Sequence, residues 1–245
     1  MKFKLLAIIL AACSISAFAS EQTHWSYEGN GAPQNWSKIS PEFSECTNGK
    51  NQSPVDIHNS FTVHATPLSL SYLASPESIV NNGHSVQVNV PKGDTLIADG
   101  ETFTLQQFHF HSPSENTIDG KSFPMEAHFV HTNAAGEIAV VAVMFNVGDE
   151  NKELAKIWEK MPSEQGKPAN ITEKVNLAKL LPAEHNHYRF SGSLTTPPCT
   201  EGVRWLVMKQ PQTLSEAQLE KFQHAMHHAN NRPVQDLHGR VIVAE

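Results

Sequence analysis

Apolar and polar residues alternate over several short stretches of this chain. The alternation is clear at 68–72, 86–90 and 203–207, and Asn82-Gly83 forms a turn signal just before the second stretch. The stretch 138–145 differs, because it is almost continuously apolar and rich in valine. Alternation is typical of a strand with one covered face, whereas a continuous apolar run is typical of a strand buried on both faces. These patterns predict a sheet with 138–145 in its middle.

Helical periodicity is convincing in only two places. Apolar residues at helical spacing occupy 154–161, and Pro162 ends the helix. A second helix begins after Ser215, which forms a capping box with Gln218, and continues through Met226. No internal repeat and no linker rich in Gly, Ser or Pro divides the chain. We therefore expect one mainly β domain with peripheral helices, an α+β fold.

The composition narrows the classes of partner. Hydrophobic residues make up 39% of the 245 residues, which is ordinary for a soluble globular protein with a substantial core. The formal net charge is −7 at pH 7, and Lys and Arg form no cluster. Nucleic acids and anionic membranes bind to concentrated basic faces, so neither is an expected partner. Small solutes are the better candidates.

The first residues have the parts of an export signal. Two lysines precede the apolar run 5–12, and Ala17-Phe18-Ala19 supplies a small-x-small cleavage site. We predict a cleaved signal peptide at 1–19, because the apolar run is too short to span a membrane. The mature domain, 20–245, is then expected in the periplasm or secreted. The residues around Cys13 offer an alternative, since they also resemble a lipoprotein processing site that would tether the protein.

Export also changes how the cysteines are interpreted. Removal of Cys13 with the signal leaves Cys46 and Cys199, an even pair in an oxidising compartment. A disulfide between them is therefore predicted, with two buried free thiols as the alternative. Closing so long a loop stabilises the fold by about 5 kcal/mol in the chain-entropy model.

Three histidines form the most informative chemical pattern. Because side chains alternate along a strand, His109 and His111 are expected on one face, with the phenylalanines between and before them on the other. If His128 comes from a neighbouring strand, three neutral nitrogens without cysteine make the ligand set of a catalytic zinc with one open position. Gln107 and Glu126 share faces with these histidines and are expected to accept hydrogen bonds from their other ring nitrogens. The alternative is a set of hydrogen-bonded core histidines.

The remaining histidines are weaker candidates for a metal-binding or catalytic role. His131 has the opposite strand parity from His128, so a structural role is expected. His224, His227 and His228 lie on the second helix at spacings compatible with another metal site, but a solvated helix face explains them better.

Several segments together resemble a known family. They are NQSPVDI at 51–57, QFHFH at 107–111, SENTI at 114–118 followed by Phe123, EAHFV at 126–130, and GSLTTPP at 192–198. From Trp25 to the C-terminus the chain resembles an α-class carbonic anhydrase, most closely the secreted bacterial members. The resemblance implies a single domain around a central, largely antiparallel twisted sheet, and the reversible hydration of carbon dioxide to bicarbonate and a proton.

The resemblance also assigns roles to residues. It implies Zn2+ bound by the three histidines, which lowers the pKa of a bound water to about 7, the value established for this family. The hydroxyl of Thr195 would accept the proton of the zinc-bound hydroxide and donate its own to Glu115. His84, which follows a turn as the family's shuttle does, would carry protons to buffer. The implied apolar wall for carbon dioxide consists of Val130, Val140, Leu194, Thr196, Val203 and Trp205. The residues implied to order water between shuttle and zinc are Tyr27, Asn81 and Asn82.

Two other functions are compatible with the same motifs. Some relatives keep the fold as binding proteins without turnover, but they have lost ligand histidines that this chain retains. A zinc hydrolase of esters is the second alternative, since the same hydroxide attacks other carbonyl compounds; a narrow apolar pocket argues that this would be a side activity. The expected partners are carbon dioxide and bicarbonate, with a homodimer by family analogy. Aromatic sulfonamides are expected to inhibit.

Overall fold

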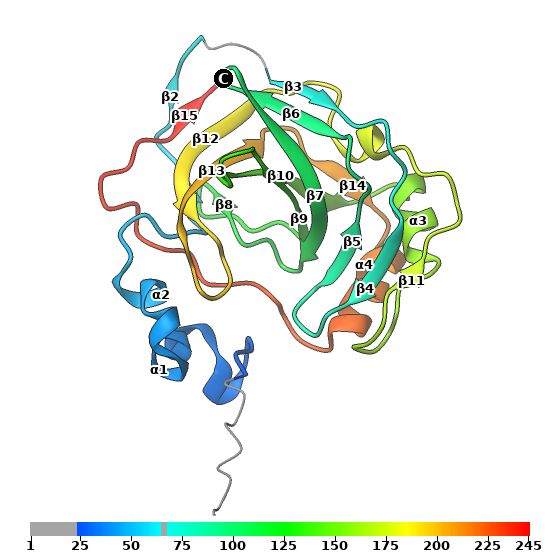
Figure 1. Ribbon diagram of the computed structural model, residues 1–245, viewed down its shortest axis with the longest axis horizontal. Helices are drawn as coiled ribbons and strands as arrows, with labels where there is room; N and C mark the ends of the chain where they lie inside the picture. Colours follow the sequence, from blue (N-terminus) through cyan, green and yellow to red (C-terminus); the bar gives the residue numbers. More distant parts are fainter. Residues whose placement is uncertain (1–23, 65–67) are drawn as a thin grey trace, which may run out of the picture.

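A large twisted sheet forms the body of the molecule (Figure 1). The structure is a computed structural model that describes residues 24–64 and 68–245, so the predicted signal peptide and Cys13 lie outside the described residues. Within these ranges the sheet has 13 strands. Ten of them follow the order β11-β4-β5-β7-β9-β10-β13-β12-β15-β2, and β3, β6 and β14 lie off this path. Their bounds are β2 (Phe61–Thr62), β3 (Ser69–Ser71), β4 (Ser78–Asn81), β5 (Val86–Asn89), β6 (Thr95–Ala98), β7 (Glu101–His111), β9 (Met125–Thr132), β10 (Ile138–Val147), β11 (Ala169–Asn170), β12 (His187–Ser193), β13 (Glu201–Met208), β14 (Gln212–Leu214) and β15 (Val243–Ala244).

Most neighbouring strands of this sheet are antiparallel. The exceptions are β13 and β14, which run parallel to β10, and β2, which runs parallel to β15. A separate parallel pair joins β1 (Asp56–Ile57) and β8 (Thr117–Ile118). The predicted fold class, mainly β around a largely antiparallel sheet, is confirmed.

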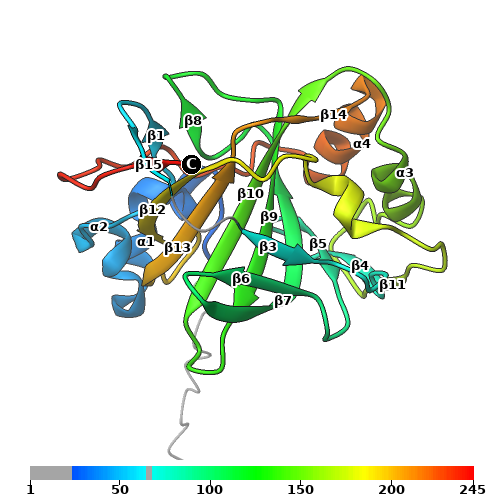
Figure 2. The same ribbon diagram turned by 90° about the horizontal axis from the view of Figure 1, so that it is seen from above.

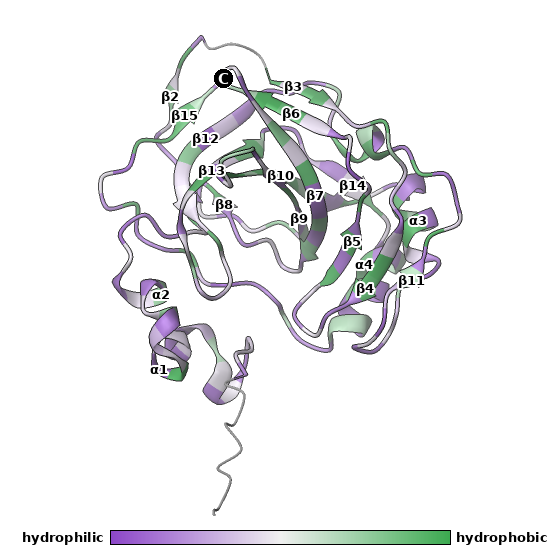
Figure 3. Cartoon of the chain, in the orientation of Figure 1, coloured by the Kyte–Doolittle hydropathy of each residue, from purple (hydrophilic) through white to green (hydrophobic). Residues whose placement is uncertain are grey.

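Strand β10 occupies the middle of the sheet, as its apolar run predicts. It lies between β9 and β13, and its residues 139–145 are all buried. The period-two stretch at 86–90 forms β5, in which buried and partly buried residues alternate, and hydrophobic and hydrophilic positions alternate along β5 and β7 (Figure 3). The stretch 203–207 differs from the prediction, because residues 205–208 of β13 are all buried. The contrast between the two sequence patterns therefore holds for β5 and β10.

A β-bulge at Gln106 changes the face to which β7 presents its apolar residues. The pairing of β7 with β9 shifts between Leu105 and Gln107, so one residue is left over. As a result Phe103 and Leu105, at odd positions, and Phe108, at an even position, all belong to the same hydrophobic core. The bulge thereby frees the odd positions beyond it to face the other side of the sheet.

The two predicted helices are present, as α3 (Lys152–Trp158) and α4 (Glu216–Met226). The capping box of Ser215 and Gln218 is formed, and both helices lie on one side of the molecule (Figure 2). Short helices near the start of the described chain were not predicted, because a single turn is too short to show periodicity. They are α1 (Trp36–Ile39), α2 (Glu45–Asn48) and the 3-10 turns η1 (Gly29–Gly31), η2 (Pro33–Asn35) and η3 (Pro41–Phe43); η4 (Leu177–Leu180) lies later. None of the helices in the described ranges has both the length and the apolar character needed to cross a membrane.

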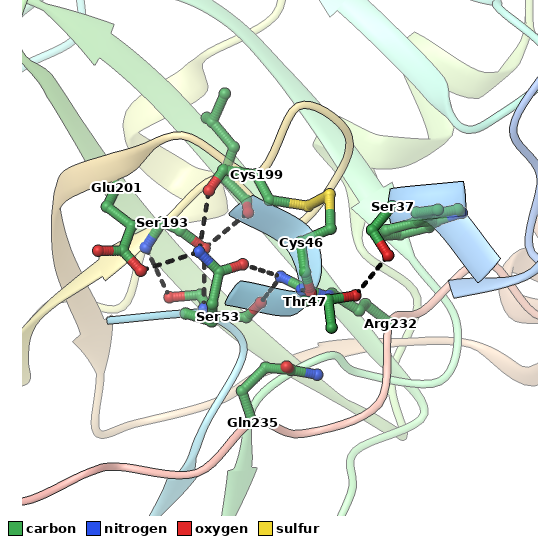
Figure 4. Close-up of a disulfide and its surroundings, with 12 residues drawn as sticks. Ser37, Cys46, Thr47, Ser53, Ser193, Cys199, Glu201, Arg232 and Gln235 are labelled. Carbon is green, nitrogen blue, oxygen red and sulfur yellow. Dashed lines mark hydrogen bonds between the residues drawn. A yellow bond between two sulfur atoms is a disulfide. The ribbon is translucent and has the colours of Figure 1, made fainter. Parts of the chain in front are cut away.

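The predicted disulfide between Cys46 and Cys199 is confirmed (Figure 4). It joins α2 to the loop between β12 and β13, across 153 residues of sequence. Both cysteines pack in a small aromatic cluster with Tyr27 and Trp36. The N-terminal helices, which Figure 1 shows beside the sheet, are thus fastened to a loop that the sequence assigned to the chemistry.

Candidate metal centre

The three predicted ligand histidines converge on one face of two paired strands. His109 on β7 lies directly opposite His128 on β9, and His111 follows two residues later on β7. The ring centroids are 5.1 Å apart for His109 and His111, 5.4 Å for His109 and His128, and 4.5 Å for His111 and His128. One ring nitrogen of each lies within 4.8 Å of the others. The alternation of side chains along β7 and β9 therefore brings these imidazoles together.

Two of the three imidazoles lie beside the polar residues that the sequence predicts. His109 Nδ1 donates to Gln107 Oε1 at 2.9 Å, so its Nε2 keeps the lone pair. His128 Nε2 lies 3.0 Å from Glu126 Oε1, but it has no hydrogen-bond partner among the described residues. Glu126 Oε2 accepts a bond from the backbone N–H of Glu115, at 2.7 Å. Glu126 therefore fixes the loop that follows β7 and lies against a predicted ligand.

The partner of His111 was not predicted. His111 Nδ1 donates to the backbone carbonyl of Asn230, at 2.7 Å, across 119 residues of sequence. The Asn230 side chain is buried as well, and its Nδ2 donates to the carbonyls of Phe110 and His84. A backbone carbonyl has no signature in a sequence, so only the fold reveals this contact. Asn230 links a predicted ligand to the predicted shuttle.

The electrostatics of the three imidazoles suit a divalent metal. Burial lowers the pKa of His109 and of His128 well below 6.5, and the neighbouring imidazoles lower them further. Burial also lowers the pKa of His111, although its bond to Asn230 opposes this. All three are therefore neutral at pH 7, the state in which imidazole binds a metal. His111 Nε2 is buried and has no hydrogen-bond partner among the described residues, so these residues fit an ion such as zinc.

Glu115 lies beside the histidines with one oxygen directed at them. Its Oε2 is 3.5 Å from His111 Nε2, while Oε1 accepts the backbone N–H of Arg232 at 2.8 Å. Burial raises the pKa of Glu115 to about 8, against the opposing effects of the Arg232 N–H and the Thr195 side chain. Thr195 is also buried, and its side chain lies near this carboxyl group, whose Oε2 has no hydrogen-bond partner among the described residues.

The loop that carries Thr195 is fixed at several points. Leu194 N–H donates to the Thr200 carbonyl at 2.9 Å, and Cys199 N–H donates to the Thr196 carbonyl at 2.9 Å. The disulfide and a bond from the Gln52 side chain to the Cys199 carbonyl tie the same loop to the N-terminal part of the domain. The Thr195 hydroxyl is therefore carried on a constrained loop.

The residues of the implied apolar wall lie together. Val140, Val203 and Trp205 belong to one hydrophobic cluster, and Val130 and Leu194 pack against it. Thr196 follows on the loop. The indole of Trp205 meets the His128 ring edge to face, with centroids 4.9 Å apart. An apolar surface thus borders the imidazoles directly.

His84 lies at a turn on the edge of this region. The turn uses Gly83 at a φ of +88°, and Asn82 Oδ1 accepts the backbone N–H groups of His84 and Ser85 at 2.9 and 2.8 Å. The imidazole of His84 stacks flat on Trp25, with centroids 3.7 Å apart. Burial, together with the nearby His24 and His228, lowers the pKa of His84 to about 4.

The three residues implied to order water have different surroundings. Tyr27 is largely buried, and its hydroxyl has no hydrogen-bond partner among the described residues. Asn82 uses its oxygen for the turn. Asn81 is buried, and its amide bonds the Gly83 N–H and the Ala225 carbonyl, both at 3.0 Å. Asn81 therefore holds the turn.

His131 has the structural surroundings that its parity predicts. It lies on the core face of β9, where its Nε2 accepts a hydrogen bond from Tyr72 OH at 2.6 Å. The late helix was predicted to carry His224, His227 and His228, but α4 ends at Met226, so only His224 lies on it. The His224 and His227 rings lie 5.7 Å apart, and the three histidines form no metal-competent group in the described part of the chain.

Comparison with known proteins identifies the family. The model of the eukaryotic-type carbonic anhydrase family matches residues 31–245. The chain belongs to this α-class carbonic anhydrase family. A carbonic anhydrase from Pectobacterium carotovorum is 52% identical over 244 residues, which cover 99% of this chain and 100% of that protein.

Solved structures agree with this assignment. The α-carbonic anhydrase from Thermovibrio ammonificans, in complex with the inhibitor sulfanilamide, matches with a TM-score of 0.88 and 47% identity over 90% of this chain and 98% of that one. Dioscorin in complex with ascorbate matches with a TM-score of 0.85 and 29% identity over 90% of this chain and 97% of that one. The α-carbonic anhydrases are metalloenzymes, and membership of the family supports carbon dioxide hydration as the reaction of this chain.

Proposed function

We propose that the chain is a zinc enzyme that hydrates carbon dioxide reversibly to bicarbonate and a proton, with His109, His111 and His128 as the zinc ligands. The observation that carries this proposal is that the three imidazoles converge, with one nitrogen of each within 4.8 Å of the others, while protein acceptors bond the Nδ1 atoms of His109 and His111. When bound, zinc supplies hydroxide at neutral pH, because it lowers the pKa of a water to about 7, a value known for this family.

The surrounding residues would orient the reactants. The Thr195 hydroxyl would donate to Glu115, which would leave the Thr195 oxygen as an acceptor toward the nucleophile. The apolar cluster around Val140 and Trp205 would hold linear, uncharged carbon dioxide and exclude competing polar ligands. His84 is the proposed carrier of the released proton, with Tyr27, Asn81 and Asn82 beside its route. Asn81 also holds the turn that carries His84.

The proposal includes the surroundings in which the enzyme works. The disulfide suits the oxidising periplasm or the exterior of the cell, which agrees with a signal peptide at 1–19. A homodimer is retained by analogy with relatives. The solved complex of the Thermovibrio protein with sulfanilamide supports inhibition of this chain by aromatic sulfonamides.

The test is proton release after carbon dioxide is added to the purified chain. We expect rapid release that is lost on chelation, restored by zinc and blocked by sulfanilamide. Folded, zinc-loaded protein that does not accelerate release would overturn the proposal. Ascorbate binding should then be measured, because dioscorin, which shares the fold, was solved with that ligand.

A further inference from the structure

A second histidine lies close to the aromatic residues that hold His84. The rings of Trp25 and Tyr27 meet edge to face, with centroids 5.6 Å apart. His84 stacks on Trp25, and His228 lies beside Tyr27, with ring centroids 6.1 Å apart. His24 is a third imidazole, 5.4 Å from His84. Each member of the aromatic pair therefore has an imidazole of its own.

Tyr27 connects this cluster to the candidate metal centre. Burial raises the pKa of Tyr27 well above 10, and the charge of Glu115 raises it further, so the phenol lies within electrostatic reach of that carboxylate. Its hydroxyl has no protein partner among the described residues. A buried hydroxyl of this kind is expected to bond to water. Water at Tyr27 would lie near both Glu115 and His228.

The position of His228 is fixed by the same segment that holds the site. Two residues further on, Asn230 donates from its side chain to the His84 carbonyl at 3.1 Å and accepts a bond from His111 at its own carbonyl. His228 Nδ1 is bonded to the Ala229 carbonyl at 3.0 Å, which leaves Nε2 as the proton-accepting nitrogen. The side chain is partly exposed, as an acceptor that must reach buffer requires.

His228 also faces solvent-accessible space. It lines a pocket of about 280 Å³ together with His227, Glu164 and Gly83. The titratable groups around it are therefore Tyr27 and His84 on the side of the site, and His227 and Glu164 in the pocket. A proton on His228 can leave through this pocket without passing His84.

We propose that His228 is a second proton acceptor of this site and works in parallel with His84. The inference rests on the proposed function, because each hydration of carbon dioxide by one water yields one bicarbonate and one proton. That proton passes through water to the Nε2 lone pair of His228, forming imidazolium, and then to a buffer base, which restores the neutral ring. No electrons are transferred.

A second acceptor has a physical reason in the placement of the first. A proton acceptor is most efficient when its pKa is near the working pH. Stacked on Trp25, His84 is partly desolvated and close to two other imidazoles, and its pKa is lowered to about 4. In this position His84 is a weak base at neutral pH. If His228 also accepts protons and passes them to solvent through its own pocket, proton transfer from the site does not depend on His84 alone.

The kinetic test compares four variants at low buffer concentration. His84→Ala and His228→Ala are each expected to lower kcat less than about 10-fold, whereas the double variant loses about 100-fold, the lower end of what a proton acceptor contributes. All should keep kcat/KM, and added imidazole should restore kcat. His224→Ala, which replaces an exposed histidine on α4 four residues earlier, is the matched control and should behave as the wild type. A double variant no slower than His84→Ala would overturn the inference.

A second readout does not require activity. In the zinc-free protein, ring-proton NMR gives the titration midpoint of His84, which His228 lowers by charge repulsion. We expect the midpoint to rise in His228→Ala and to stay unchanged in His224→Ala. An unchanged midpoint in His228→Ala would contradict the proximity on which the inference depends. Failure of the proposed function is distinguishable, because the wild type itself would then lack kcat/KM.

Discussion

His128 and His131 are both buried on strand β9, but they lie on opposite faces and have different surroundings. The fold satisfies both nitrogens of His131, with Tyr72 OH at 2.6 Å and the Ala139 carbonyl at 3.3 Å. His128 Nε2 lies 3.0 Å from Glu126 Oε1 but has no hydrogen-bond partner among the described residues, and its Nδ1 lies 3.9 Å from Glu115 Oε2. Burial alone therefore does not mark a metal ligand. What distinguishes the two is a nitrogen that the protein itself leaves without a partner.

Substituting each of the two histidines separately should distinguish the effect on zinc binding from the effect on stability. We expect His128→Ala to weaken zinc affinity more than about 100-fold, since loss of an outer hydrogen-bond partner alone costs about 10–100-fold. His131→Gln should keep zinc affinity but lower the free energy of unfolding by about 1–3 kcal/mol, because the buried bond to Tyr72 is disturbed. Competition with a chromophoric chelator and urea unfolding of the zinc-free proteins measure the two effects. Equal loss of zinc in both variants would refute the distinction.

The sequence predicts the two faces because alternation is local information. His109 and His111 point away from Phe108 and Phe110 whatever the rest of the chain does, and the rule needs only an extended backbone. The continuous apolar run likewise placed β10 in the middle of the sheet. The bulge at Gln106 was not predictable in this way, because it depends on how β7 pairs with β9.

Long-range contacts account for what sequence reasoning missed at the site. The carbonyl of Asn230 orients His111, but any residue offers a carbonyl, so nothing in the sequence distinguishes it. The turn that carries His84 depends on a long-range contact as well. The Asn81 side chain accepts a bond from the Gly83 N–H and donates to the Ala225 carbonyl, and the second of these contacts crosses 144 residues. The sequence shows which residue types are present, but only the fold shows which hydrogen bonds their polar atoms make.

The difference between the two faces should also appear in the pH dependence of stability. Burial lowers the pKa of His131 to about 4, below the 6.5 of an exposed imidazole. The stability that neutral His131 contributes is therefore complete above pH 6.5 and is lost as the pH falls toward 4. This amounts to about 3 kcal/mol between pH 7.5 and pH 4, at 1.36 kcal/mol per pKa unit.

Zinc-free protein is the appropriate sample for this measurement. The ligand histidines titrate equally in the wild type and in His131→Gln, so the difference between the two unfolding free energies isolates position 131. We expect that difference to shrink by about 2–3 kcal/mol on acidification, since only the wild type loses the contribution of a buried neutral imidazole. A difference that stays constant with pH would show that His131 is not the group that titrates.

The smallest expected effect concerns the hydrogen bond that leaves one nitrogen of His109 free. Gln107 accepts from His109 Nδ1, while its neighbour Gln106 is exposed and bonds only the Thr104 carbonyl of its own strand. Gln107→Ala should weaken zinc affinity about 10-fold, because the ring loses its orientation and fixed tautomer. Gln106→Ala, the matched control, should leave affinity unchanged, and Gln107→Glu should preserve it by keeping the acceptor. If all three variants bind zinc equally, the geometry of β7 alone aligns His109. The partner at Gln107 would then be incidental, and the contrast with His131 would rest only on which face of the sheet a histidine occupies.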